Sequence, residues 1–208
     1  MSEDYNSVGR CIELHRPDKI LKKGKIMETV RQEISLEKTG IFSKSMDKRF
    51  EYTMERKGTE GKKILVICTN PTSNNILLVD TTTNYLMNNL FALGYSTITL
   101  CNLFADITEK LKPTNAGDNS DNMEFIKEVL KKDFDEILLG FGNGFVGNKK
   151  VKDEKDILYK ILKPYAKKLV ELVDADENYK ELKTIHPLFA GQRFSGKWKF
   201  RKFTLPKL

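Results

Sequence analysis

Polar side chains that could act on a bound ligand follow four stretches of the sequence that have the pattern of buried strands. Two of these groups supply carboxamides, one supplies glycines with a further carboxamide, and the last supplies a histidine. Ligands of open α/β folds bind at the edge where the carboxyl ends of the parallel strands meet, so we expect one shared pocket there. The four groups are Asn70-Pro71, Asn102 with Phe104, Gly140 with Gly142 and Asn143, and His186-Pro187.

The two strand-end asparagines offer hydrogen-bond donors and acceptors but no strong base. The Asn70 carboxamide can bind a water molecule or the edge of a base, and Asn102 can read a pyrimidine through two hydrogen bonds. Each has a structural alternative, because Asn-Pro commonly begins a turn and a buried asparagine commonly satisfies loop backbone groups. The functional interpretation depends on all four groups sharing one pocket.

The histidine and the glycines extend the same interpretation. His186 could donate to an oxygen that gains negative charge, or act as an acid or base, although a single histidine is more often structural. Glycines at 140, 142, 144 and 147 would allow close backbone approach to a phosphate or a ring. The run contains Gly-x-Gly without the full dinucleotide fingerprint, and the sequence has neither a Gly-x-Ser-x-Gly elbow nor a Walker loop.

We expect no metal site and no cofactor. The three cysteines, Cys11, Cys68 and Cys101, lie far apart and form no Cys-x-x-Cys pair. The chain has only two histidines, His15 and His186. These numbers and spacings fit neither a zinc cage nor a disulfide framework.

Predicted strands and helices alternate from residue 62 onward. Apolar or β-branched runs predict strands, and capping residues followed by apolar residues at helical spacing predict helices. The predicted strands are 64–68, 97–101, 136–139 and 182–185. Two helices are predicted to follow capping residues, at Asp80 or Thr81 and at Ser120 or Asp121. A third helix is predicted from Asp153 to Val173, with a kink or division at Pro164. This alternation predicts an α/β fold with a four-stranded, mainly parallel sheet between helices.

The chain is predicted to consist of two regions. Residues 48–208 form the single α/β domain, and residues 1–47 form a short N-terminal extension of β character. Short strands are predicted at 8–14 and 50–54.

The positive charge of the chain is concentrated at one end. The net charge is +7, and the segment 183–208 holds seven basic residues and no acidic one. Aromatic residues are interleaved with these charges, a combination that suits a polyanion carrying bases. We predict that Arg193, Lys197, Lys199 and Arg201 contact a nucleic-acid backbone. The alternative is a basic surface segment whose aromatic side chains pack into the core.

The overall composition is that of a soluble globular protein, with 39% hydrophobic and 31% charged residues. No apolar run approaches the roughly 20 residues of a membrane helix. The first residues lack the basic start and apolar stretch of a signal peptide. We expect a cytoplasmic location and no membrane partner.

Several of these motifs together resemble a bacterial and phage family that is known only as a domain of unknown function. The resemblance covers about residues 48–200. It is carried by Arg49-Phe50-Glu51-Tyr52, Asn70-Pro71-Thr72-Ser73, Asp80-Thr81-Thr82, the segment 101–105 (Cys-Asn-Leu-Phe-Ala) and His186-Pro187-Leu188.

The same loops, in the same order, are distantly similar to the uracil-DNA glycosylase superfamily. The resemblance implies that family's fold, with Asn70-Pro71 positioning an attacking water, Asn102 reading the base, Leu139-Gly140 ending the third strand, and His186-Pro187 leading into a basic, aromatic loop. The sequence departs from its pattern in three respects. Leu188 replaces the usual serine after His-Pro, the activating aspartate of the fastest members is absent, and the stacking aromatic residue is not obvious, with Phe104 as the candidate.

The leading functional hypothesis is recognition of a base in DNA or of a nucleotide, with hydrolysis of an N-glycosidic bond as the associated reaction. Asn70 and His186 are the candidate catalytic residues. The candidate base- or nucleotide-binding residues are Asn102, Phe104, Pro71, Gly140, Gly142 and Asn143. The alternatives are a non-catalytic module that holds a nucleotide or modified base, and a protein-interaction module whose aromatic tail packs on a partner.

Overall fold

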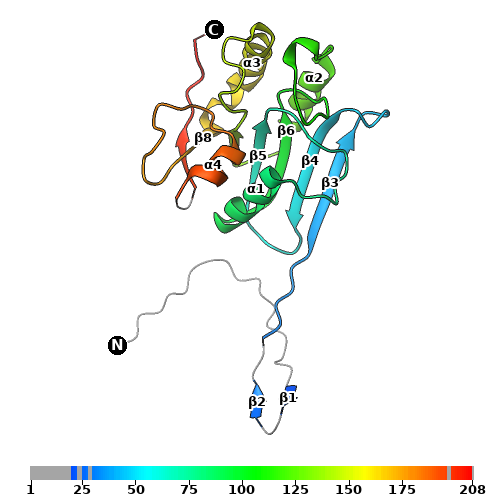
Figure 1. Cartoon of the computed structure of the whole chain (residues 1–208), viewed down its shortest axis with the longest axis vertical. Helices are drawn as coiled ribbons and strands as arrows, with labels where there is room; N and C mark the ends of the chain where they lie inside the picture. Colours follow the sequence, from blue (N-terminus) through cyan, green and yellow to red (C-terminus); the bar gives the residue numbers. More distant parts are fainter. Residues whose placement is uncertain (1–19, 23–24, 28–29, 196–197, 208) are drawn as a thin grey trace.

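A seven-stranded mixed sheet forms the centre of the protein (Figure 1). The computed structural model describes residues 20–22, 25–27, 30–195 and 198–207. The strand order in the sheet is β3-β4-β6-β5-β7-β8-β9. The strands are β3 (Leu36–Phe42), β4 (Arg49–Arg56), β5 (Lys62–Cys68), β6 (Tyr95–Asn102), β7 (Glu136–Leu139), β8 (Leu169–Val173) and β9 (Lys199–Lys202).

Four adjacent strands, in the order β6-β5-β7-β8, run parallel to one another. The antiparallel strands β3 and β4 extend the sheet beyond β6, and the antiparallel strand β9 extends it beyond β8. The carboxyl ends of the four parallel strands therefore meet at one edge, which is where the sequence places its polar groups.

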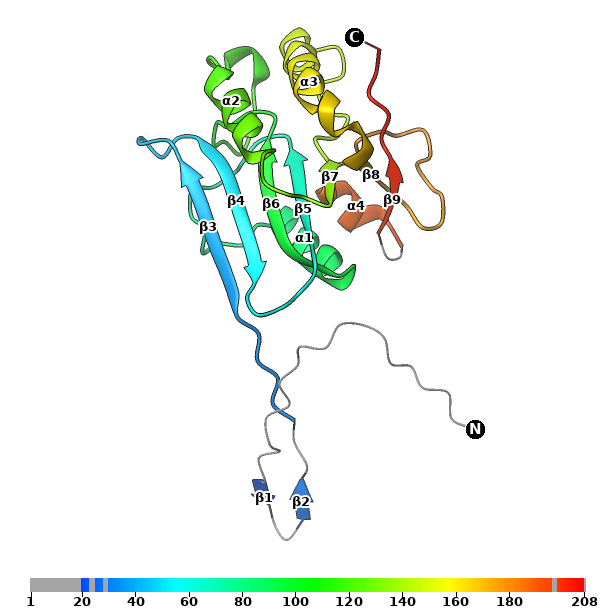
Figure 2. The same cartoon turned by 180° about the vertical axis from the view of Figure 1, so that it is seen from behind.

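Helices cover both faces of this sheet. Helices α1 (Thr81–Ala92) and α4 (Pro187–Arg193) lie on one face, and α2 (Ser120–Val129) and α3 (Lys149–Leu162) lie on the other, as the two opposite views show (Figures 1 and 2). The alternation of β5 explains this arrangement. Ile64 and Val66 pack in the cluster that contains α1, whereas Leu65 and Ile67 pack in the cluster that contains α2 and α3.

The structure confirms most of the predicted elements. The predicted strands at 64–68, 97–101 and 136–139 lie within β5, β6 and β7. Helix α1 begins after Asp80, whose side chain accepts a hydrogen bond from the backbone N–H of Thr83. It ends before Gly94, which has a φ of 88°. The predicted helix after Ser120 or Asp121 is α2, which begins at Ser120 itself, with Asn119 rather than Ser120 or Asp121 at the N-cap position.

The prediction of one helix over 153–173 is wrong, and so is the predicted strand at 182–185. Helix α3 ends at Leu162, and the 3-10 helix η2 (Lys163–Lys168), which contains Pro164, leads into strand β8. The fourth parallel strand is therefore β8, and residues 182–185 belong to the loop between β8 and α4. The sequence obscures β8 because the charged Glu171 interrupts its apolar pattern.

The N-terminal part contributes to the same sheet. Strand β4 contains the predicted strand at 50–54, and it pairs with β3, which lies in the predicted extension. The predicted boundary at residue 48 thus falls in the turn between two paired strands. Among the described strands, β1 (Ile20–Lys22) and β2 (Lys25–Met27) pair with each other and form a separate two-stranded sheet. The strand predicted at 8–14 lies outside the described residues.

Among the described residues, no helix has both the length and the apolar character needed to cross a membrane.

Candidate functional site

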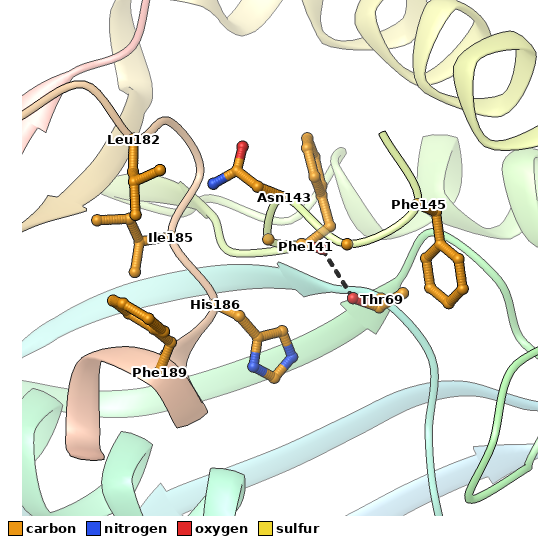
Figure 3. A pocket seen from close by; sticks show the side chains of 10 residues that line it. Thr69, Phe141, Asn143, Phe145, Leu182, Ile185, His186 and Phe189 are labelled. Carbon is orange, nitrogen blue, oxygen red and sulfur yellow. Dashed lines mark hydrogen bonds between the residues drawn. The ribbon is translucent and has the colours of Figure 1, made fainter. Parts of the chain in front are cut away.

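A cleft opens at the carboxyl edge of the parallel strands. It consists of two adjoining cavities of about 370 and 350 Å³, which share Thr69, Phe145 and His186. The larger cavity is also lined by Arg49, Asn70, Asp80 and Asn102. The smaller cavity, drawn in Figure 3, is also lined by Phe141, Gly142, Asn143 and Phe189. The structure therefore brings the four predicted polar groups together.

The His186 side chain is held as a neutral hydrogen-bond donor. It caps helix α4, and its Nδ1 accepts a hydrogen bond of 3.2 Å from the backbone N–H of Leu188. Because Nδ1 is an acceptor, the ring proton of the neutral form lies on Nε2. Burial lowers the pKa of His186 to about 4, against the opposing effect of the Asp80 charge. At neutral pH, the imidazole can therefore offer an N–H to a ligand in the cleft.

Asn102 carries a buried amide group without a protein partner. It ends strand β6, is 2% exposed and lines the larger cavity. Its backbone oxygen accepts from Asn122 Nδ2 at 3.0 Å, but its own side-chain Nδ2 has no hydrogen-bond partner among the described residues. An unsatisfied buried donor costs about 1–3 kcal/mol. A ligand that places an acceptor oxygen beside Asn102 would satisfy this donor.

The amide nitrogen of the Asn70 side chain is hydrogen-bonded to backbone oxygens, whereas its oxygen has no hydrogen-bond partner in the described part of the chain. Its Nδ2 donates to the backbone oxygens of Thr108 at 2.7 Å and of Pro71 at 3.0 Å. Oδ1 is the group left for a ligand or a water molecule. Pro71 itself is buried and supports this loop, because its oxygen also accepts from the backbone N–H of Thr108.

The strand-end glycines serve close packing of the His-Pro segment. A Cβ atom at Gly140 would lie 3.0 Å from Pro187 Cδ, and one at Gly142 would lie 3.2 Å from His186 Cβ. Gly142 also has a φ of 73° and donates its backbone N–H to Thr184 O at 2.7 Å. These two glycines thus position His186, and Gly142 also lines the smaller cavity.

Asn143 also holds loops together, because its Nδ2 donates to the Lys183 backbone oxygen at 2.8 Å.

The candidate stacking residue Phe104 does not lie in the cleft. It is fully buried and packs in the core with Leu65 and Ile67. Phe145 is the aromatic residue that lines both cavities, with 41% of its surface exposed and a φ of 64°. Figure 3 shows Phe145 near Thr69, and the His186 ring beside Phe189 at the start of α4.

Arg49, Asp80 and Phe145 line this site but are not among the site residues predicted from the sequence. Asp80 carries a recognisable helix-capping signal, which conceals its second role as a cleft residue. Phe145 stands within the glycine run, which is the one sequence signal that could have indicated it.

Arg201, a predicted backbone contact, is engaged within the protein. Its Nε contacts Glu171 Oε1 at 2.7 Å, and its Nη2 donates to the Leu182 backbone oxygen at 2.8 Å. Glu171 is 1% exposed, and its other oxygen accepts from the Thr184 backbone N–H at 2.7 Å. This ion pair therefore fixes the loop that leads to His186.

The remaining basic candidates differ in position. Arg193, the last residue of α4, and Lys199, the first of β9, are exposed. Lys197 lies outside the described residues. The aromatic residues Trp198 and Phe203 are buried in the protein's own core, as the alternative interpretation of this segment expects.

The described residues contain no group of three or more His, Cys, Asp or Glu side chains that could hold a metal ion. The free groups of the cleft are instead N–H donors on Asn102 and His186 and an acceptor on Asn70, which suit an organic ligand with carbonyl and N–H groups.

Fold and site together define an α/β protein with a ligand-binding cleft at the carboxyl edge of its parallel strands. A family model, described as a protein of unknown function (DUF1643), matches residues 51–188, about two thirds of the chain. The chain belongs to this family. Neither a curated protein nor a solved structure matches it.

Proposed function

We propose that this protein recognises a nucleobase, in DNA or in a nucleotide, in the manner of a uracil-DNA-glycosylase-like protein. The observation that carries the proposal is the Asn102 side chain, which lines the larger cavity and whose buried Nδ2 has no hydrogen-bond partner among the described residues. A base carbonyl would satisfy that donor. Discrimination then follows, because a ligand without the matching acceptor leaves the amide unsatisfied.

The associated reaction is hydrolysis of the N-glycosidic bond. The oxygen of a water molecule would attack the sugar carbon and lose one proton to solvent. The bond to the base would break, its electron pair would leave with the base, and solvent would then protonate the base. The Asn70 Oδ1 can orient the water by accepting one of its protons in a hydrogen bond. The neutral His186 can donate from Nε2 to the base oxygen that gains negative charge.

A non-catalytic module on the same scaffold is the second candidate, and one observation favours it. The Asn70 amide nitrogen is held by two backbone oxygens, so this side chain binds water through one atom only. In this alternative, the same cleft holds a nucleotide or a modified base without turnover.

Single-turnover base release, measured beside equilibrium binding, separates the two candidates. The substrates are a panel of damaged and modified bases in single- and double-stranded DNA. For an enzyme, we expect Asn70→Ala to lose base release but retain binding, and His186→Ala to release the base about 10²–10³-fold more slowly.

The variant Asn102→Ala should instead relax base choice, by about 1–3 kcal/mol. If the wild type releases no base from any substrate, but both asparagine variants lose affinity for free nucleotides, the protein is a binding module. If it neither releases nor binds any base, the proposed function is contradicted.

A further inference from the structure

Arg49 lines the larger cavity as a buried cation with unused donors. It is 7% exposed, and its Nε has no hydrogen-bond partner among the described residues. Its Nη1 donates to the Ser73 backbone oxygen at 3.3 Å. The guanidinium forms no salt bridge with any residue that the structure describes. A buried charge is costly unless a partner compensates it, so this group is a candidate for a ligand-binding role.

A β-bulge in β4 directs this side chain into the cleft. The pairing of β4 with β3 shifts by one residue, which leaves Phe50 as the extra residue of β4. Phe50 stacks on Phe125 of helix α2, whereas the Arg49 guanidinium lies 5.2 Å from the ring centroid of Tyr52, in the cluster that contains α1. Bulges re-aim side chains in this way beside functional sites.

The surrounding charges leave Arg49 without a direct anionic partner. Burial lowers the pKa of its guanidinium, and the charge of Asp80 opposes this effect. Asp80 already accepts from Thr83 N at 2.7 Å and from Thr72 Oγ1 at 3.1 Å. An arginine remains protonated even when it is buried, and its planar donors match the oxygens of a phosphate.

We propose that Arg49 forms an anion subsite and that the ligand of the cleft carries a phosphate: a nucleotide, or one nucleotide unit of a strand. This inference rests on the proposed function, because Asn102 and His186 would hold the base of the same ligand. All three side chains line one cavity of about 370 Å³, a volume within the usual range of small-molecule sites. Base binding would then depend on Asn102 and His186, and phosphate binding would depend on Arg49.

Arg56 provides a matched control on the same strand. It also has a buried Nε without a partner among the described residues, and its guanidinium lies 5.6 Å from the ring centroid of Phe91. It does not line the cleft. If Arg49 has only a structural role, Arg49→Gln and Arg56→Gln should therefore have similar effects on ligand affinity.

The experiment is calorimetric titration of the whole chain with four sets of ligands. These are nucleosides, the corresponding 5′-monophosphates, short single-stranded oligonucleotides that contain the same bases, and inorganic phosphate. We expect wild type and Arg56→Gln to bind a phosphate-bearing ligand at least about tenfold more tightly than its nucleoside. Arg49→Gln should lose that advantage and keep its nucleoside affinity, and Arg49→Lys should keep part of it. Thermal unfolding of each variant checks that it is folded.

Comparison of these ligands identifies the source of the phosphate and tests the Arg49 subsite separately from base recognition. An Arg49-dependent advantage for monophosphates indicates a free nucleotide, and one for oligonucleotides alone indicates a phosphodiester. Equal affinities for nucleosides and phosphate-bearing ligands, or an advantage that survives Arg49→Gln, overturn the subsite and leave base recognition standing. Arg49-dependent binding of inorganic phosphate without any nucleoside binding supports the subsite and contradicts base recognition. If no ligand binds, both are overturned.

Discussion

At the residue scale, the cleft depends on hydrogen-bonding atoms that the protein leaves free, and Asn102 is the clearest case. Replacing it with leucine, a side chain of similar size, removes an unsatisfied buried donor. We expect the free energy of unfolding to remain unchanged or to rise by about 1 kcal/mol, while base binding is lost. Urea denaturation beside ligand titration measures both effects. A loss of stability above about 2 kcal/mol would instead identify the amide as a structural group.

His186 makes a second residue-scale prediction, which concerns pH. Its pKa is about 4 in the folded protein and about 6.5 in an unfolded chain, so the unfolded state binds a proton first as the pH falls. The stability contributed by the neutral histidine is therefore present above pH 6.5 and declines between pH 6.5 and 4. We expect His186→Gln to flatten the decline in urea-unfolding free energy across this window. His15→Gln, at the only other histidine of the chain, is the control. An equal decline in all three proteins would contradict the shifted pKa.

At the element scale, the loop between β8 and α4 depends on the ion pair of Arg201 with Glu171. Arg201→Ala leaves the buried carboxylate without its closest charged partner, although Lys183 Nζ remains at 3.5 Å, so we expect the free energy of unfolding to fall by about 3 kcal/mol. Lys199→Ala removes an exposed charge on the same strand and should change stability by less than about 0.5 kcal/mol. Equal and small effects of the two substitutions on the chemical denaturation midpoint would show that the loop does not need the ion pair.

Some of these elements can be predicted from local sequence signals, and others depend on contacts between distant residues. Local signals identify α1, because Asp80 and Gly94 mark its ends, and the apolar run of β5 identifies a strand buried on both faces. Strand β8 is missed because the partners that allow Glu171 in a buried strand lie far along the chain, at Lys183, Thr184 and Arg201.

The residues of the candidate site likewise include some that the sequence predicts and some that it does not. Asn70, Asn102 and His186 are predicted to meet because each follows a predicted strand of one parallel sheet. All three line one cavity, although the residues before His186 form a loop and His186 instead caps α4. Arg49 is missed because the bulge that aims it depends on the pairing of β4 with β3. Phe104 is predicted in the cleft but is buried, since the pattern does not distinguish the two faces of its loop.

At the scale of the whole molecule, the net charge of +7 is concentrated in residues 183–208. Because Arg201 is engaged in an ion pair, the exposed residues Arg193 and Lys199 are the better candidates for phosphate contacts. We expect the double variant Arg193→Ala, Lys199→Ala to flatten the salt dependence of DNA affinity by up to about two units, roughly one for each lost contact. Binding measured across a salt series tests this. An unchanged slope would assign the segment a purely structural role.

The central claim is that a nucleobase binds at Asn102 and His186, and side-chain NMR tests it most directly. In ¹⁵N-labelled protein, the Asn102 side-chain amide is assigned by its absence in Asn102→Leu, and the spectra are followed during titration with pyrimidine and purine nucleosides and nucleotides. We predict that the Asn102 amide and the His186 ring signals shift together and saturate at the same ligand concentration for at least one base. If neither group responds to any base while the protein remains folded, the account of this cleft is contradicted.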